Sequence, residues 1–226
     1  MADAVISMTS WPGRLPTLSR VVGNLVEKCP GFRVVINLCR QEFAGLDIPY
    51  LPAEINWVDR NTGPFKKVLP TVSMYPDLPV ISADDDALYS VDYARMLVEE
   101  CLEHPGFAIS NIPNVKTGNV SLPNGYCTIY PPHSLDGADK WLTDRIIATN
   151  NDDCFYGLVL AGNGYGIHHM MKTGLATFVQ DSVGLGKTGR YRSGNSDLRL
   201  IIGEMLKAGW PGIDSEIFRK KWMRHL

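Results

Sequence analysis

The order of the apolar segments is the feature that most constrains the fold of this chain. Residues 4–8 form a short apolar run, and the breakers Pro12 and Gly13 follow it. Apolar side chains then recur at the spacing of one buried helix face, at Leu18, Val21, Val22, Leu25 and Val26. Further apolar runs occupy 32–38 and 55–58. A strand, a helix and a strand in this order predict a parallel, right-handed β–α–β unit rather than a hairpin.

The rest of the chain continues this alternation of strands and helices. We expect further strands at 80–83, 107–110 and 126–130. Helical patterns occur in five more segments. One covers 66–75, with Pro70 in its first turn, and another is capped by Ser90 and carries Leu97, Val98, Cys101 and Leu102 inward. The other three cover 140–148, 153–161 and 196–208. These elements predict a single α/β domain over residues 1–226, with a mostly parallel central sheet flanked by helices.

Length and charge exclude some classes of protein. The 226 residues, of which 45% are hydrophobic, suffice for one domain that buries roughly 70% of the unfolded chain's surface. The 22 basic and 24 acidic residues give a formal net charge of −2. Because proteins that bind nucleic acid usually carry a basic excess, we expect no nucleic-acid partner.

The cysteines and the apolar runs indicate the cellular compartment of the protein. Its five cysteines are scattered and include no C-x-x-C pair, which predicts reduced thiols rather than a zinc site or a disulfide framework. No segment approaches the ~18 apolar residues of a membrane span, and the amino terminus lacks the features of a signal peptide. We therefore expect a soluble, cytoplasmic protein with no transmembrane segment.

An acidic triplet is the strongest candidate for a functional site. Asp84, Asp85 and Asp86 directly follow the apolar run 80–83, and ligands of open α/β sheets bind at the carboxyl ends of strands. In an extended chain Asp84 and Asp86 would share one side while Asp85 points away. A divalent cation would relieve the repulsion among the three carboxylates, and oxygen ligands favour Mg²⁺ or Mn²⁺. The alternative is a solvated acidic turn before a helix.

Two adjacent histidines are a weaker candidate. The side chains of His168 and His169 would diverge on a helix and face opposite ways on a strand, so one of them could bind a metal but not both. We favour ordinary core or surface histidines at these positions.

Several blocks of the sequence together resemble a known family. They are residues 5–14 (VISMTSWPGR), 66–70 (KKVLP), 80–89 (VISADDDALY), 125–132 (GYCTIYPP) and 151–157 (NDDCFYG). In this order they are similar to nucleotide-sugar glycosyltransferases of GT-A fold, in particular to small bacterial and viral enzymes of surface-polysaccharide synthesis, including chlorovirus capsid-glycan enzymes. The resemblance implies a Rossmann-like GT-A domain, with a nucleotide-sugar-binding half at 1–90 and an acceptor-binding half with carboxyl-terminal helices at 91–226.

The resemblance also implies roles for individual residues. Asp84 and Asp86 would be the acids of a D-x-D motif: Asp84 lies near the ribose or donor sugar, and Asp86, with Asp84, holds Mn²⁺ or Mg²⁺ on the diphosphate, while Asp85 assists. The remaining nucleotide-sugar contacts would come from two segments, Thr9, Ser10, Trp11 and Arg14 in the first and Asp59, Lys66 and Lys67 in the second. For Lys66 and Lys67 the alternative is a solvated first turn of a helix.

A second acidic pair, Asp152 and Asp153, resembles the pair that supplies the base in inverting members of this family. We favour Asp153 as the base that accepts the proton of the acceptor hydroxyl; the alternative is that either residue caps the helix that follows. Residues 184–194 have the glycines and basic side chains of a lid over the diphosphate, or of an ordinary surface loop.

The predicted function is therefore metal-dependent, inverting transfer of a sugar from a UDP- or GDP-linked donor to a glycan acceptor. Two alternatives remain open. One is a metal-dependent phosphotransferase or phosphatase with an aspartate nucleophile, and the other is a non-catalytic carbohydrate-binding domain of the same fold.

Overall fold

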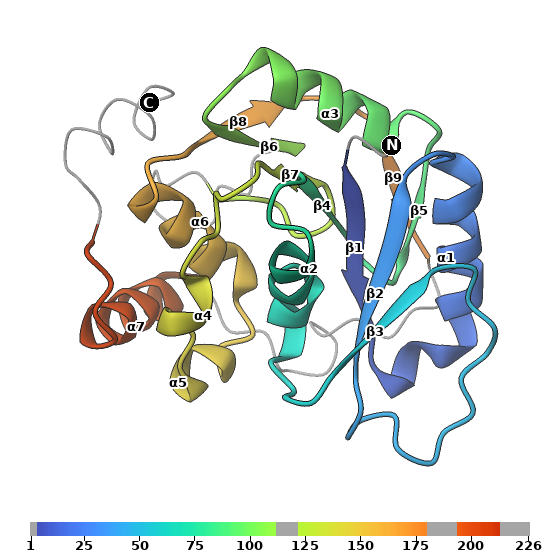
Figure 1. The fold of residues 1–226 in the computed structure, drawn as a ribbon, viewed down its shortest axis with the longest axis horizontal. Coiled ribbons are helices and arrows are strands. Elements are labelled where there is room, and N and C mark those ends of the chain that lie inside the picture. Colours follow the sequence, from blue (N-terminus) through green and yellow to red (C-terminus); the bar gives the residue numbers. More distant parts are fainter. Residues whose placement is uncertain (1–3, 112–121, 180–193, 213–226) are drawn as a thin grey trace.

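A seven-stranded sheet lies at the centre of the fold (Figure 1). The computed structural model describes residues 4–111, 122–179 and 194–212. Across the sheet the strands follow the order β3 (Glu54–Val58), β2 (Arg33–Cys39), β1 (Val5–Thr9), β4 (Val80–Ala83), β7 (Thr128–Tyr130), β6 (Phe107–Asn111) and β8 (Gly166–Met170).

Most of the neighbouring strands are parallel. Strand β1 pairs in parallel with both β2 and β4, and β3 pairs in parallel with β2. Strand β7 runs antiparallel to β4 and β6, whereas β8 is parallel to β6. The mostly parallel α/β sheet and its parallel first β–α–β unit are confirmed. A second sheet pairs β5 (Ala87–Tyr89) with β9 (Ala176–Phe178) in antiparallel fashion. Strands β5, β8 and β9 were not among the predicted elements.

Helices cover both faces of the sheet. One hydrophobic core packs α1 (Leu15–Lys28) and α3 (Tyr93–Glu103) against strand residues such as Ile6 and Ile81. In the other core, Val80 and Tyr130 pack with residues of the helices α2 (Leu69–Met74), α4 (Ala138–Trp141), α5 (Asp144–Ile147), α6 (Asp152–Gly162) and α7 (Gly194–Lys207). Successive strand residues thus alternate between two buried faces, which explains why the strands read as continuous apolar runs.

Three helix predictions need correction. Ser90 does not cap α3, because its N–H donates to the Leu175 carbonyl at the end of the β5–β9 ladder, and the helix begins only at Tyr93. Leu102, expected to point inward, is 78% exposed. The helix predicted over 66–75 is a 3-10 turn, η2 (Gly63–Lys67), followed by α2, with Pro70 in its first turn as expected.

The helix predicted over 140–148 is also interrupted. It is divided into α4 and α5, and Thr143 caps α5 by accepting a hydrogen bond from Ile146 N at 3.4 Å.

The described residues contain no helix that is long and apolar enough to cross a membrane. All five cysteines lie in the described part of the chain and carry free thiols, as predicted.

A buried polar network joins η2 and α2 to the sheet. The Ser7 hydroxyl on β1 donates to the Lys67 carbonyl, and Ser7 Oγ lies 2.6 Å from Thr71 Oγ1. Asn37 on β2 donates to the same Thr71 hydroxyl at 2.9 Å and accepts at 2.8 Å from Asn56 on β3. Because Ser7, Asn37 and Thr71 are fully buried, each lost bond would leave a desolvated polar group unsatisfied. The network therefore determines where the Lys67 backbone lies.

We predict that Thr71→Val lowers the free energy of unfolding by about 1–3 kcal/mol, because it removes the hydroxyl shared by Ser7 and Asn37 while keeping the shape of the side chain. Urea unfolding measures the change. The matched control is Thr17→Val, which removes a half-buried hydroxyl bonded only locally to the Arg14 carbonyl and should change stability by less than about 0.5 kcal/mol. Equal effects of the two changes would contradict the role of the network.

Candidate active site

The acidic triplet lies in a turn between β4 and β5. Asp84 directly follows β4 at the carboxyl end of the strand, and its backbone N–H donates to the Tyr89 hydroxyl at 2.7 Å. Tyr89 is buried on β5, and the Asp86 carbonyl accepts from Val179 N at 2.7 Å. Both ends of the turn are thus held, so the three carboxylates project from a fixed backbone at the edge where α/β proteins bind ligands.

Asp85 and Asp86 contact residues that follow β1. The Ser10 hydroxyl donates to Asp85 Oδ2 at 2.6 Å, and Arg14 Nη2 donates to Asp86 Oδ2 at 2.8 Å. Arg14 Nη1 also lies 3.8 Å from Asp85 Oδ1, and Arg14 is only 4% exposed. Burial raises the pKa of Asp85 to about 6, although Arg14 and the Ser10 hydroxyl partly oppose this. One buried guanidinium therefore lies against two neighbouring carboxylates and compensates part of their charge.

Asp84 turns instead to Lys67. The Lys67 ammonium lies 2.6 Å from Asp84 Oδ1 and 3.5 Å from Asp152 Oδ2, and it donates to the Gly125 carbonyl at 3.0 Å. A Cβ built on Gly125 would lie 3.0 Å from Asp153 Oδ1, so Asp153 borders the same space. A single lysine thus connects the acid at the end of β4 with the acidic pair at the start of α6.

The charges in this cluster strongly perturb one another. Burial alone would lower the pKa of Lys67, but the negative charges of Asp84, Asp152 and Asp153 outweigh it and raise the pKa well above its usual range. Burial raises the pKa of Asp152, with the Lys67 charge opposing and the Asp84 charge adding to the effect. Lys67 therefore stays protonated, and the carboxyl groups compete for its charge.

Local structure places the second acidic pair. Asn151 is the N-cap of α6, and its side chain accepts from Cys154 N at 3.2 Å. The alternative that Asp152 or Asp153 caps this helix is therefore wrong, because both lie in the first turn, where the helix dipole favours negative charge. One turn further along, the buried Tyr156 hydroxyl donates to the Phe65 carbonyl at 2.9 Å. This bond ties α6 to η2, the segment that carries Lys67.

The structure brings most of the predicted site residues together, but in a different arrangement. Asp84 does not share partners with Asp86: Asp85 and Asp86 share Arg14, whereas Asp84 contacts Lys67. The solvated alternative for the two lysines is wrong, because Lys66 and Lys67 are 2% and 7% exposed. Lys66 pairs with Glu42 and donates to Asn61 Oδ1 at 2.8 Å, away from the acids.

Three other predicted residues have different surroundings. Asp59 has a side chain that is 91% exposed and pairs with Arg40 at 3.2 Å. The Thr9 hydroxyl donates to the Asn37 carbonyl at 2.7 Å and so links β1 to β2. The Trp11 ring packs over Gly13, where a Cβ would lie 2.3 Å from the ring. Of residues 184–194, all but the last lie outside the described part of the chain.

The acidic turn has suitable groups for a divalent cation. Asp84 and Asp86 offer carboxylate oxygens, and their side chains are 28% and 18% exposed. Within the described residues, the carboxylates of the triplet do not form a cluster of three ligand atoms, so they could supply one or two ligands to an ion. Mg²⁺ is commonly held by one or two carboxylates together with substrate phosphates and water.

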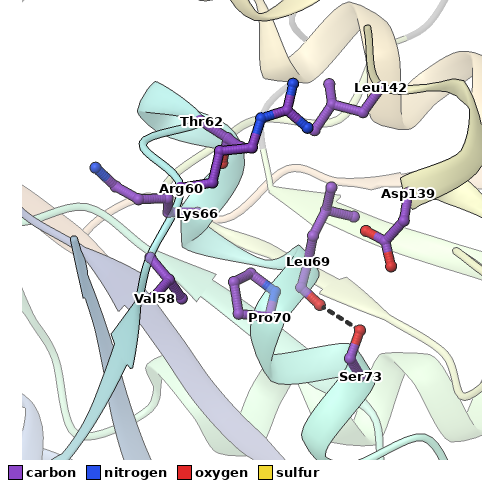
Figure 2. Close-up of a pocket in the computed structure, with 9 residues that line it drawn as sticks. All are labelled: Val58, Arg60, Thr62, Lys66, Leu69, Pro70, Ser73, Asp139 and Leu142. Atoms are coloured by element: carbon purple, nitrogen blue, oxygen red, sulfur yellow. Dashed lines mark hydrogen bonds between the residues drawn. The ribbon is translucent and has the colours of Figure 1, made fainter. Parts of the chain in front are cut away.

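A separate pocket of about 330 Å³ lies beside η2 and α2 (Figure 2). Its lining combines apolar and charged side chains: Val58, Arg60, Thr62, Lys66, Leu69, Pro70, Ser73, Asp139 and Leu142. Neither acidic cluster lines it. Lys66 thus faces this pocket while the adjacent Lys67 faces the acids, which the sequence alone did not reveal.

Gly125 is a site residue that sequence analysis missed. Its carbonyl accepts from Lys67, and its missing side chain leaves room for Lys67 and Asp153. The available signal was its place at the start of one of the family-like blocks, although glycine carries no chemistry of its own.

We predict that Gly125→Ala lowers the free energy of unfolding by about 1–3 kcal/mol. The new Cβ would lie 2.8 Å from Lys67 Nζ and 3.0 Å from Asp153 Oδ1, so the buried ammonium must move away from its carboxylates. Gly23→Ala on α1 is the matched control, because its Cβ meets nothing within 4 Å and alanine favours a helix. Denaturant unfolding of both variants gives the comparison; a Gly125→Ala protein as stable as the parent would contradict this packing.

Solved structures share this fold. A structure of S. aureus TarS in complex with UDP-GlcNAc matches with a TM-score of 0.62 and 12% identity, covering 100% of this chain and 71% of that chain. The mannosyltransferase PcManGT from Pyrobaculum calidifontis, in complex with GDP-Man and Mn²⁺, matches with a TM-score of 0.57 and 14% identity, covering 99% and 68%. No protein-family model and no curated protein matches the sequence. The chain therefore has the α/β fold of TarS and PcManGT, which confirms the predicted fold class.

Proposed function

We propose that this protein transfers a sugar from a nucleotide-diphospho-sugar to a hydroxyl group of a glycan acceptor. The observation that carries the proposal is the position of Lys67, which joins the acid that ends β4 to the acidic pair that begins α6. Glycosyl transfer has two requirements at adjacent points. The negative charge of the leaving diphosphate must be stabilised, and the attacking hydroxyl must lose its proton. The nucleotide sugars bound to TarS and PcManGT, which share the fold, support the proposal.

On the donor side, Asp86 and Asp84 would hold Mn²⁺ or Mg²⁺. When bound, the cation supplies positive charge that stabilises the diphosphate as it leaves. Arg14 and Lys67 now neutralise these acids, and both cations are suited to phosphate oxygens. The nucleotide would be UDP or GDP, bound by the half of the chain at 1–90, with Ser10 holding Asp85 in place.

On the acceptor side, we assign the base to Asp153. Asp152 is 12% exposed at its side chain and is engaged by Lys67, whereas Asp153 is half-buried. The carboxylate of Asp153 accepts the hydroxyl proton as the acceptor oxygen forms its bond to the anomeric carbon. The bond from that carbon to the diphosphate breaks, and its electron pair leaves with the nucleotide. Attack opposite the leaving group inverts the anomeric centre.

The end of β1 argues against the phosphotransferase alternative. Phosphotransferases with an aspartate nucleophile commonly carry an acidic motif after an early strand, whereas β1 ends at Thr9 and is followed by Ser10 and Trp11.

We predict that UDP-GlcNAc or GDP-Man, or another UDP- or GDP-sugar, binds only weakly without Mn²⁺ and at least about tenfold more tightly with it, equivalent to about 1.4 kcal/mol. Asp86→Asn should abolish the effect of the metal, because the amide is neutral. Isothermal calorimetry measures both. Asp77→Asn is the control, since Asp77 is 88% exposed at its side chain and lies on another surface beside His133. The proposal is wrong if these donors do not bind, or if Asp86→Asn binds them like the parent.

We also predict that Asp153→Asn lowers kcat by about 10²–10⁴-fold while donor affinity changes less than about threefold, because only proton transfer is lost. Release of free UDP or GDP, measured with a panel of sugar glycosides as acceptors, reports turnover. A normal rate in Asp153→Asn would exclude this residue as the base. Donor binding by the parent protein without any turnover would instead support the non-catalytic alternative.

A further inference from the structure

Away from the candidate active site, three potential metal ligands meet between α3 and β8. They are Glu100, His104 and His168, and one ligand atom from each lies within 4.8 Å of the others. In the part of the chain that the structure describes, this is the one such group of three. The proposed glycosyl transfer uses none of these residues.

The fold explains how these residues meet. Glu100 and His104 are four residues apart, so their side chains lie on one face at the carboxyl end of α3. His168 lies in β8, whose neighbour β6 directly follows α3 in the chain and packs against it. In Figure 1, α3 and β8 lie next to each other at the top of the molecule, far from α5. The group therefore joins two segments that are more than sixty residues apart in sequence.

The distances suit a small tetrahedral ion. Glu100 Oε2 lies 3.4 Å from His104 Nε2 and 3.8 Å from His168 Nε2. Ligands about 2.0–2.1 Å from a tetrahedral zinc ion are about 3.4 Å from one another. Two imidazoles and one carboxylate are also a common zinc ligand set, with water as the fourth ligand. The side chains are 26–36% exposed, so an ion can enter from solvent.

The two imidazole rings need one adjustment. They are stacked, with centroids 3.8 Å apart and planes inclined by 21°. A metal ion binds a ring nitrogen in the plane of the ring, and it cannot lie in two nearly parallel planes at once. One ring must therefore turn about its χ2 bond, a torsion with a broad energy minimum.

We propose that Glu100, His104 and His168 bind one zinc-like transition-metal ion that clamps the end of α3 to the edge strand β8. The site differs in chemistry from the acidic turn, since its two nitrogen ligands favour Zn²⁺ or Co²⁺ over Mg²⁺. It is independent of the proposed transferase activity.

The test is a titration of the full chain with Co²⁺, followed by its visible absorption, and then displacement of Co²⁺ by Zn²⁺. We expect one equivalent of Co²⁺ with the strong bands of a tetrahedral site. Glu100→Gln and His168→Gln should each weaken Zn²⁺ binding by more than about 100-fold, since even changes behind the ligands cost about 10–100-fold. Zinc at a hundredfold excess over its Kd should raise the Tm of the parent protein by roughly 5–10 °C.

Two controls separate this site from other binding. His133→Gln removes an exposed histidine that contacts Asp77 and Asp136 elsewhere and should leave the titration unchanged. Asp86→Asn should also leave the tetrahedral bands unchanged, so failure of this proposal is distinguishable from failure of the active-site assignment. The proposal is overturned if the tetrahedral bands are absent, if Glu100→Gln binds Zn²⁺ like the parent, or if His133→Gln weakens binding equally.

Discussion

The buried ammonium of Lys67 is the contact on which the arrangement of the candidate site depends. It lies between Asp84 and Asp152, two carboxylates that belong to distant segments of the chain. Burying a charged amine is costly, and removing one partner of a buried pair costs about 3–5 kcal/mol. The contact is therefore favourable only while both carboxylates stay in place. The Ser7 hydroxyl donates a hydrogen bond to the Lys67 carbonyl, so the geometry of the site depends on how η2 packs on β1.

The candidate site contains many charged side chains although the whole chain is almost neutral. A net charge of −2 conceals five aspartates around two buried cations: Arg14 contacts Asp85 and Asp86, while Lys67 lies among Asp84, Asp152 and Asp153. This excess of acids suits a divalent cation, and the two basic side chains suit a diphosphate. Near-zero net charge thus excludes a broadly basic surface but not an anionic ligand.

Much of the fold follows from local patterns. The spacing of the apolar residues from Leu18 to Val26 predicts α1, because a helix places them all on one face. That face packs on the sheet, and the polar residues face solvent. Strand β4 is equally clear, since both of its faces are buried. Local patterns failed where pairing with a distant segment decided the structure. Residues 87–89 form a strand only because β9 pairs with them, and this pairing moves the start of α3 beyond Ser90.

The sequence by itself predicted the candidate site residues: an acidic turn after a buried strand, a second acidic pair near a helix start, and basic residues that precede both in the chain. Only the tertiary structure decided how these groups pair. It pairs Asp84 with Lys67, Asp86 with Arg14 and Lys66 with Glu42, and it leaves Asp59 in solvent. The physical reason is that burial and charge compensation depend on distances between segments, and no local spacing in the chain encodes those distances.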